Sequence, residues 1–351
     1  MGYRAQPDHR ADRRDGRLEP KVKASRALGY RAQPDHRADR RDGRLKSEKK
    51  RSRALGYRAQ PDHRADRRDG RLEQKGIYMK TILENVRRRT PLVHFITNYV
   101  TVNDVANMML ACGGSPIMSD DKRDVEDITT ICNALVINIG TLNERSIESM
   151  ILAGKRANAL GHPVILDPVG AGASKFRTET TFRLLEELKF TVIRGNISEI
   201  KTVYSGSGST KGVDADVADT VTEDNLKETA EFARQLSKTT GAIIAMTGAI
   251  DVIADAEHAY AVKNGVAEMS KITGTGCMLD GVIAGYVAAN MENQTNAVVA
   301  AIVAEGLCGE IAGAKVKAEG RGTSSLRMYL IDAMSNLDGD TLVKGAKVEE
   351  I

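Results

Sequence analysis

Lys271-Ile-Thr-Gly-Thr-Gly-Cys-Met-Leu-Asp-Gly281 is a glycine-rich turn that leads into a predicted helix, and it indicates the fold class of the chain. The small and apolar run that follows, Val282-Ile-Ala-Gly-Tyr-Val-Ala-Ala289, predicts that this helix is buried. Gly274 and Gly276 let the backbone turn tightly and approach a ligand, because neither carries a Cβ atom. The free N–H groups and the positive helix end then suit a phosphate or a developing oxyanion. A tight turn into a packed helix is the alternative.

Strand and helix patterns alternate on both sides of this turn. Ala134-Leu-Val-Ile-Asn-Ile139 has the continuous apolar character of a buried parallel strand. Glu144–Leu160 predicts a helix that Gly161 ends. The alternation predicts an α/β fold, with a mostly parallel central sheet, helices on both faces and a small antiparallel edge near residues 250–269.

Polar side chains follow the predicted strands at the ends where such sheets bind ligands. In addition to the Gly274–Cys277 turn, they are Asn98, Asp167, Arg194, Asn196, Glu199 and Thr247. Because so many polar residues converge on one edge of the sheet, a ligand site is favoured over a merely structural turn.

These residue types suit phosphoryl transfer, which depends mainly on positioning and on neutralising charge. Arg194 directly follows a strand and can fork onto phosphate oxygens, although a surface ion pair is the alternative. Asp167 and Glu199 offer hard oxygens for Mg²⁺, directly or through water, but either could be only a charge at a helix start. Asn196 could likewise be only the N-cap of the helix that carries Glu199.

Cys277 stands at the start of the predicted helix, where the helix dipole favours a thiolate. It is therefore a candidate weak base, or else a small residue that shapes the pocket. The other cysteines lie in apolar helical contexts that predict core positions: Cys112, Cys132 and Cys308. His94 lies in a predicted strand, where a core histidine is the ordinary interpretation.

Residues 1–78 differ in composition from the rest of the chain. One 17-residue string occurs three times, at Gly2–Leu18, Gly29–Leu45 and Gly56–Leu72. Residues 1–76 hold 24 Lys and Arg and 12 Asp and Glu, whereas the remaining 275 residues hold 27 and 35. Because the repeats offer few apolar residues to bury, we expect a disordered basic repeat tract over 1–78 and a globular domain over 79–351.

The origin and role of the repeat tract stay open from the sequence. Its near-identical units suggest a recent duplication, or a misplaced start codon with the true start near Met79. A basic arm that grips nucleic acid is a further alternative. The tract mixes acids with its arginines and has one tyrosine per unit, and the globular part is acidic, so nucleic acid is not the expected partner. We expect the tract to be non-functional.

The location signals indicate a soluble cytoplasmic protein. The N-terminus lacks the apolar core of a secretory signal. Glu305 and Glu310 interrupt the most apolar stretch, so no membrane span is expected. The four cysteines form no Cys-x-x-Cys pair and have no nearby histidines, so neither zinc nor a disulfide framework is indicated and a reducing cytoplasm fits.

Seven motifs occur in an order and at spacings that resemble the hydroxyethylthiazole kinase family, a thiamine-salvage branch of the ribokinase-like superfamily. They are Ile96-Thr-Asn98, Gly114-Ser-Pro-Ile-Met118, Asn138-Ile-Gly-Thr141, Asp167-Pro-Val-Gly-Ala-Gly172, Arg194-Gly-Asn-Ile-Ser-Glu199, Ala245-Met-Thr-Gly248 and Gly274-Thr-Gly-Cys277. The resemblance covers the chain from about Met79 to the C-terminus. The repeat tract has no counterpart in it.

The resemblance implies an ATP-dependent phosphorylation of the primary hydroxyl of 5-(2-hydroxyethyl)-4-methylthiazole, with Mg²⁺. It also implies a homotrimer whose active sites lie between subunits. Most ribokinase-like kinases carry an aspartate base where Cys277 stands, but hydroxyethylthiazole kinases are similar to this chain in having cysteine there. Weak base assistance can suffice for a loose transition state, because positioning supplies most of the rate.

The motif match also assigns residues to the two substrates. Met118 and Gly274 would contact the thiazole alcohol, and Asn98 would line its pocket. Arg194 and Thr247 would bind ATP.

The remaining assignments concern the metal and the phosphates. Asp167, Glu199 and Asn196 would organise Mg²⁺ and the phosphate groups, and Thr275 and Gly276 would belong to the anion-binding loop.

Three other functions stay possible at this point. A kinase for hydroxymethylpyrimidine or pyridoxal is disfavoured by the Gly-Thr-Gly-Cys and Ser-Pro-Ile-Met segments. A dehydratase that repairs hydrated nicotinamide nucleotides would need an aspartate in place of Cys277. A nucleic-acid-binding module with a vestigial kinase fold is disfavoured by the intact set of polar residues at the strand ends.

Overall fold

The computed structural model describes residues 78–206 and 220–351. The predicted disordered tract, residues 1–78, lies outside this part except for Tyr78, which belongs to a helix covering residues 78–89. From the sequence, the amphipathic pattern predicts a short helix over Leu83–Arg89, and the structure extends it toward the N-terminus to residue 78. Its buried residues recur at the three- and four-residue spacing of an amphipathic helix, so packing holds the added turn. They are Met79, Ile82, Leu83 and Val86.

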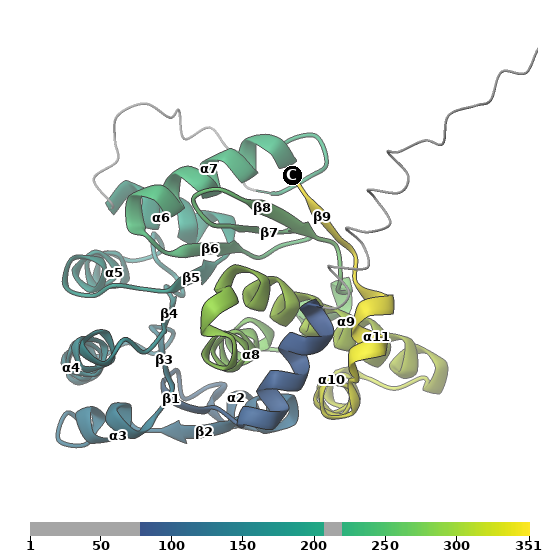
Figure 1. Cartoon of the computed structure of the whole chain (residues 1–351), viewed down its shortest axis with the longest axis horizontal. Coiled ribbons are helices and arrows are strands. Elements are labelled where there is room, and N and C mark those ends of the chain that lie inside the picture. Colours follow the sequence, from purple (N-terminus) through teal and green to yellow (C-terminus); the bar gives the residue numbers. More distant parts are fainter. Residues whose placement is uncertain (1–77, 207–219) are drawn as a thin grey trace, which may run out of the picture. The chain divides into compact units, whose positions relative to one another are not determined.

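A nine-stranded sheet lies at the centre, in the order β2-β1-β3-β4-β5-β6-β7-β8-β9 (Figure 1). The pairings from β2 to β6 are parallel, and those from β6 to β9 are antiparallel. The strands are β1 (Leu92–Ile96), β2 (Ser115–Met118), β3 (Ala134–Asn138), β4 (Val164–Asp167), β5 (Val192–Gly195), β6 (Ile243–Met246), β7 (Asp251–Ala254), β8 (Ala259–Val262) and β9 (Val348–Glu350). The antiparallel edge expected near residues 250–269 is confirmed, and β9 extends it.

Helices cover both faces of the sheet (Figure 1). One face carries α2 (Val102–Cys112), α8 (Thr275–Ala289), α9 (Gln294–Glu319), α10 (Thr323–Asn336) and α11 (Gly339–Gly345). The other carries α3 (Val125–Ile131), α4 (Glu144–Leu160), α5 (Lys175–Glu187), α6 (Ile197–Gly206) and α7 (Leu226–Thr240). Short 3₁₀ turns, Ala267–Lys271 and Met291–Asn293, precede α8 and α9.

Successive strand residues point into two separate cores. In β3, Ala134 and Val136 belong to the core beneath α8, whereas Leu135 and Ile137 belong to the core beneath α4. A strand that is buried on both faces has to be apolar throughout, as the sequence pattern indicated. The expected α/β architecture is therefore confirmed: a mostly parallel sheet lies between two helical layers.

Glu305 and Glu310 lie within one continuous helix and do not interrupt it. Met291–Glu319 is 29 residues long, and its most apolar window has a mean hydropathy of 1.7, which suffices by length and composition to cross a bilayer. However, 72% of that window is buried inside the protein, as in the core helix of a globular domain. Glu305 is itself buried.

The topology places the carboxyl ends of the parallel strands around the start of α8. β1 lies between β2 and β3, the two strands that follow it in the chain, so the direction of winding reverses there. Open α/β sheets bind ligands beyond the strand ends next to such a reversal. In the next pair, Asn138 at the end of β3 lies opposite Asp167 at the end of β4.

Candidate active site

The turn before α8 requires glycine at position 274. Gly274 is the N-cap of α8 and has a φ of 88°, in the left-handed region that favours glycine. A Cβ atom there would also overlap the side chain of Thr101. Met278 donates from its backbone N–H to the Gly274 carbonyl at 2.8 Å, which closes the first helical turn. The N–H groups of the first turn lack helical acceptors, so this helix start can hold an anion.

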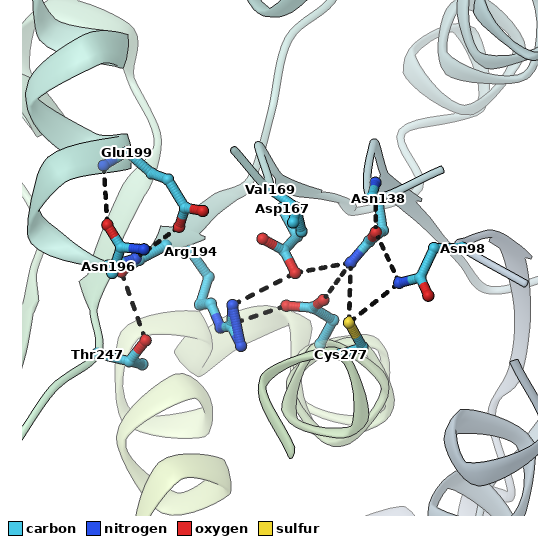
Figure 2. Close-up of polar contacts among 12 residues, drawn as sticks. Asn98, Asn138, Asp167, Val169, Arg194, Asn196, Glu199, Thr247 and Cys277 are labelled. Carbon is cyan, nitrogen blue, oxygen red and sulfur yellow. Dashed lines mark hydrogen bonds and ion pairs between the residues drawn. The ribbon is translucent and has the colours of Figure 1, made fainter. Parts of the chain in front are cut away.

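Cys277 lies in that first turn and receives two side-chain hydrogen bonds (Figure 2). Nδ2 of Asn98 donates to its Sγ atom at 3.1 Å, and Nδ2 of Asn138 does so at 3.3 Å. Asn98 is fixed in turn, because its Oδ1 accepts from the backbone N–H and the hydroxyl of Thr101 at 3.1 and 2.9 Å. These two amide N–H groups orient the half-exposed sulfur of Cys277. The sulfur is thereby placed to accept a proton from a bound hydroxyl.

Asn138 connects Cys277 to the buried carboxylates. Its Nδ2 donates to Oδ2 of Asp167 at 2.7 Å and to Oδ2 of Asp280 at 3.3 Å. Its Oδ1 accepts from Nδ2 of Asn98 at 3.1 Å and from the backbone N–H of Gly140 at 2.9 Å. Asn138 opens one of the seven motifs, but its sequence context predicted no role for it. The one sequence feature that could have indicated its role was a single amide at the end of an otherwise apolar strand.

Arg194 reaches from the end of β5 between two buried carboxylates (Figure 2). Its Nη1 lies 3.3 Å from Oδ2 of Asp167, and its Nε lies 3.5 Å from Oδ1 of Asp280. The alternative of a surface ion pair is wrong, because only 7% of the Arg194 side chain is exposed. Burial lowers the pKa of Arg194, but the two carboxylates raise it more, so its charge is retained.

Asp280 is the second residue that sequence reasoning missed. It is fully buried, and it is the only charged residue of α8. Burial and the neighbouring Asp167 raise its pKa well above the ordinary value, although Arg194 opposes them. The available signal was a carboxylate inside an apolar helix, three residues after Cys277 and thus on the same helix face.

Gly276 brings the predicted anion loop against Arg194. A Cβ atom at position 276 would overlap the guanidinium, with Nη2 as its nearest atom. Thr275 and Gly276 therefore lie where a phosphate on the helix start would also meet the arginine.

Asn196 and Glu199 form a reciprocal cap at the start of α6. The backbone N–H of Glu199 donates to Oδ1 of Asn196 at 3.0 Å, and that of Asn196 donates to Oε2 of Glu199 at 2.9 Å. Oε1 of Glu199 accepts from the backbone N–H of Gly170 at 2.8 Å. The interpretation of Asn196 as an N-cap is thus confirmed. Burial raises the pKa of Glu199, and the two N–H donors counteract part of that shift.

The oxygen atoms near Asp167 fit Mg²⁺. Oδ1 of Asp167 is buried and has no hydrogen-bond partner within residues 78–206 and 220–351. A carboxylate oxygen of this kind is a suitable ligand, and Glu199 could reach the same ion through water, since both its oxygens already accept N–H groups. Asp167, Cys277 and Asp280 also offer ligand atoms within 4.8 Å of one another. That trio does not fit a cation, because the Asn138 amide donates into all three.

The remaining predicted residues lie at the same edge of the sheet. Thr247 follows β6 and donates from its backbone N–H to the Gly195 carbonyl at 2.9 Å, which holds it beside the end of the Arg194 strand. Met118 ends β2, is half-buried, and packs against the core that also contacts Cys277. Met118 has no part in the polar network around Cys277.

The core assignments from the sequence are confirmed. His94 is buried, its Nδ1 lies 2.9 Å from the Thr129 hydroxyl, and its Nε2 lies 2.9 Å from the Ser119 carbonyl. Burial lowers the pKa of His94. The three other cysteines are buried and free: Cys112, Cys132 and Cys308.

Several proteins that are similar to this chain are described as hydroxyethylthiazole kinases. The model of the hydroxyethylthiazole kinase family matches residues 83–340. A hydroxyethylthiazole kinase of Clostridium acetobutylicum is 59% identical over 271 residues, which cover 77% of this chain and 99% of that protein. One of Desulfovibrio desulfuricans is 50% identical over 277 residues, covering 77% and 97%. The solved hydroxyethylthiazole kinase of Pyrococcus horikoshii OT3 is 33% identical, with a TM-score of 0.68 over 78% of this chain and 99% of that one.

Proposed function

Because the chain belongs to the hydroxyethylthiazole kinase family, we propose that it transfers a phosphoryl group from ATP to the primary hydroxyl of 5-(2-hydroxyethyl)-4-methylthiazole. The observation that carries this proposal is the meeting of Cys277, Arg194 and Asp167 at the first turn of α8. A proton acceptor, a phosphate-binding cation and a free carboxylate oxygen are the parts that phosphoryl transfer to an alcohol requires.

Each part has a defined task in the proposed reaction. Cys277 accepts the proton of the substrate hydroxyl, while the amides of Asn98 and Asn138 orient its sulfur. The N–H groups of Thr275 and Gly276 and the guanidinium of Arg194 bind the transferred phosphoryl group and balance its charge. Since the site is built before substrate arrives, little reorganisation accompanies the reaction.

Mg²⁺ belongs to the proposal as the cation that accompanies ATP. Asp167 would hold it through Oδ1, with Glu199 and Asn196 acting through water from the cap of α6. When bound, the ion supplies charge neutralisation at the phosphate oxygens. Thr247 would contact ATP from the end of β6.

The thiazole alcohol would bind between Met118, Asn98 and Gly274, with a second subunit covering it. Support for the cover comes from Tyr99 and Val100, which follow Asn98 and are 76% and 62% exposed. Apolar side chains this exposed beside a substrate site suit a subunit contact. The homotrimer that the resemblance implies, and the cytoplasmic location expected from the sequence, belong to the proposal.

The experiment that tests the activity is ADP release from ATP and Mg²⁺. Three reactions are compared, with hydroxyethylthiazole, with hydroxymethylpyrimidine and without acceptor. Turnover that requires the thiazole alcohol is the expected result. Turnover with the pyrimidine alone, or equal turnover without acceptor, would mean that the substrate is wrong.

The domain assignment, a repeat tract over 1–78 and a kinase domain over 79–351, is tested by the same assay. A protein that starts at Met79 should show the turnover and the oligomeric mass of the full chain, because the family match begins at residue 83. Loss of turnover or of assembly on truncation would assign the tract a role.

A further inference from the structure

Asp280 is a carboxylate in a place that an apolar side chain could fill. Its α8 neighbours from Met278 to Val287 are buried, and Asp280 is as buried as they are. An unpaired carboxylate in such surroundings costs several kcal/mol, so its position is tolerated only with compensating partners. These partners are Arg194 and Asn138.

The three nitrogens of the Arg194 guanidinium face two elements, β4 and α8. Nε faces Asp280 of α8 at 3.5 Å, and Nη1 faces Asp167 of β4 at 3.3 Å. Nη2 lies against the backbone of Gly276, where a Cβ atom would overlap it. Of the two carboxylates, only Asp280 lies on α8, and the first turn of α8 forms the anion loop.

The orientation of this guanidinium depends on a balance between the two carboxylates. An arginine left with a single carboxylate forms two parallel hydrogen bonds with it, which is the most favourable geometry for the pair. Without Asp280, the guanidinium would turn fully onto Asp167. That movement would withdraw Nη2 from Gly276 and occupy Asp167, whose Oδ1, like Oδ1 of Asp280, has no hydrogen-bond partner in the described ranges.

We propose that Asp280 is a positioning residue, which holds Arg194 on the first turn of α8 and keeps it from closing on Asp167. It thereby leaves Nη2 directed at the nucleotide phosphates and Asp167 available to the cation. This role rests on the proposed function, since it assumes that nucleotide and Mg²⁺ bind at this helix start. Asp280 itself is fully buried, so its proposed role is exerted through Arg194.

The test compares four full-length proteins: the natural chain, Asp280→Asn, Asp280→Leu and Asp255→Asn. Asp255→Asn is the matched control, because Asp255 accepts from the backbone N–H groups of His258 and Glu257 at 2.7 and 2.8 Å in the β7–β8 turn, where it is structural. Because β7 runs antiparallel to β6, that turn lies at the other end of the strands from the candidate active site. Calorimetric binding of ADP is measured over a range of Mg²⁺ concentrations, together with thermal unfolding and KM for ATP and for the thiazole alcohol.

Both Asp280 variants should bind ADP with Mg²⁺ about tenfold or more weakly and need more Mg²⁺, as outer-shell changes at metal sites do. KM for ATP should rise, while KM for the thiazole alcohol and the binding of the control variant should not change. If Asp280→Asn does not fold, Asp280→Leu decides, because it restores an apolar helix. Unchanged ADP affinity and Mg²⁺ dependence in a folded Asp280 variant would overturn the proposal, as would equal weakening in the control.

The binding measurement also separates this proposal from the proposed function. If the natural chain binds ADP with Mg²⁺ but does not phosphorylate the thiazole alcohol, the substrate assignment fails and the role of Asp280 is still decided. If ADP does not bind to the natural chain, the premise of the positioning role is refuted.

Discussion

The polar residues at the strand ends form two groups that are held in different ways. Cys277, Arg194 and Asp280 are held by side chains from β3, from β4 and from the segment after β1, so their contacts join segments far apart in sequence. Asn196 and Glu199 are held mostly by backbone N–H groups of their own helix start. We call the first group the α8 network and the second the α6 cap.

This difference predicts how far the effect of a substitution travels. In the α8 network each side chain orients the next, so one change should alter proton acceptance, phosphate binding and stability together. In the α6 cap the backbone supplies the partners, so a change should stay local. The following substitutions test that contrast.

Arg194→Gln should have the largest effect, because it removes the cation that joins both carboxylates to the anion loop. We expect kcat/KM to fall about 10³-fold, the scale of a phosphate-contacting arginine. The unfolding temperature should fall as well, since Asp167 and Asp280 then lack their cationic partner. Steady-state kinetics and thermal unfolding measure both. Arg183→Gln, which removes a surface pair with Glu187 within α5, is the control that should change neither.

Cys277→Ala should lower kcat about 10²-fold, the lower part of the range for losing a general base. Cys277→Ser should retain part of the rate, because a hydroxyl can accept the same two amide hydrogen bonds. The matched control is Cys308→Ala, a buried thiol in α9 away from the polar network. Equal kcat in the natural chain and in Cys277→Ala would reduce the thiol to a space-filling role.

The same contrast explains what the sequence could and could not predict. The strand–helix alternation and the glycine turn depend on local patterns, and both the sheet and the start of α8 appeared where those patterns placed them. The α6 cap also follows a local rule, since its two side chains stand three residues apart.

The centre of the α8 network could not be predicted in this way. Asn138 and Asp280 are 142 residues apart, and nothing local indicates that they meet. Asp280 in particular looked like part of an ordinary helix, because a single carboxylate does not disturb an apolar pattern. Only the folded structure shows that Oδ1 of Asp280 lies 3.5 Å from Nε of Arg194.

Glu199→Gln should have a smaller effect, about tenfold on the Mg²⁺ requirement, as expected for a ligand that acts through water. Its raised pKa adds a test by pH. The proposed role needs the carboxylate, so activity of the natural chain should be present above that pKa and be lost as the pH falls through it. In Glu199→Gln this acidic loss should disappear. A persistent acidic loss would assign it to another group.

Asp251→Asn should have the smallest effect and should act on stability alone. Asp251 lies at the start of β7, where burial raises its pKa from 3.8 to about 7, while the Gly248 N–H and Arg194 lower it in part. The folded state then favours the protonated form, so the natural chain should lose stability as the pH rises from about 4 to about 7. The amide keeps an acceptor for the Gly248 N–H, which lies 2.9 Å from Oδ1.

Denaturant unfolding at several pH values measures this effect. Above pH 7 Asp251→Asn should be more stable by on the order of 1 to 2 kcal/mol, after allowance for partial exposure, and the gap should close toward pH 4. Asp255, at the other end of β7, supplies a control of opposite sign. Burial raises its pKa, but the His258 and Glu257 N–H groups lower it more, so Asp255→Asn should lose stability above its ordinary pKa. If the stability of both variants changed in the same direction, the change would reflect net charge and not these local contacts.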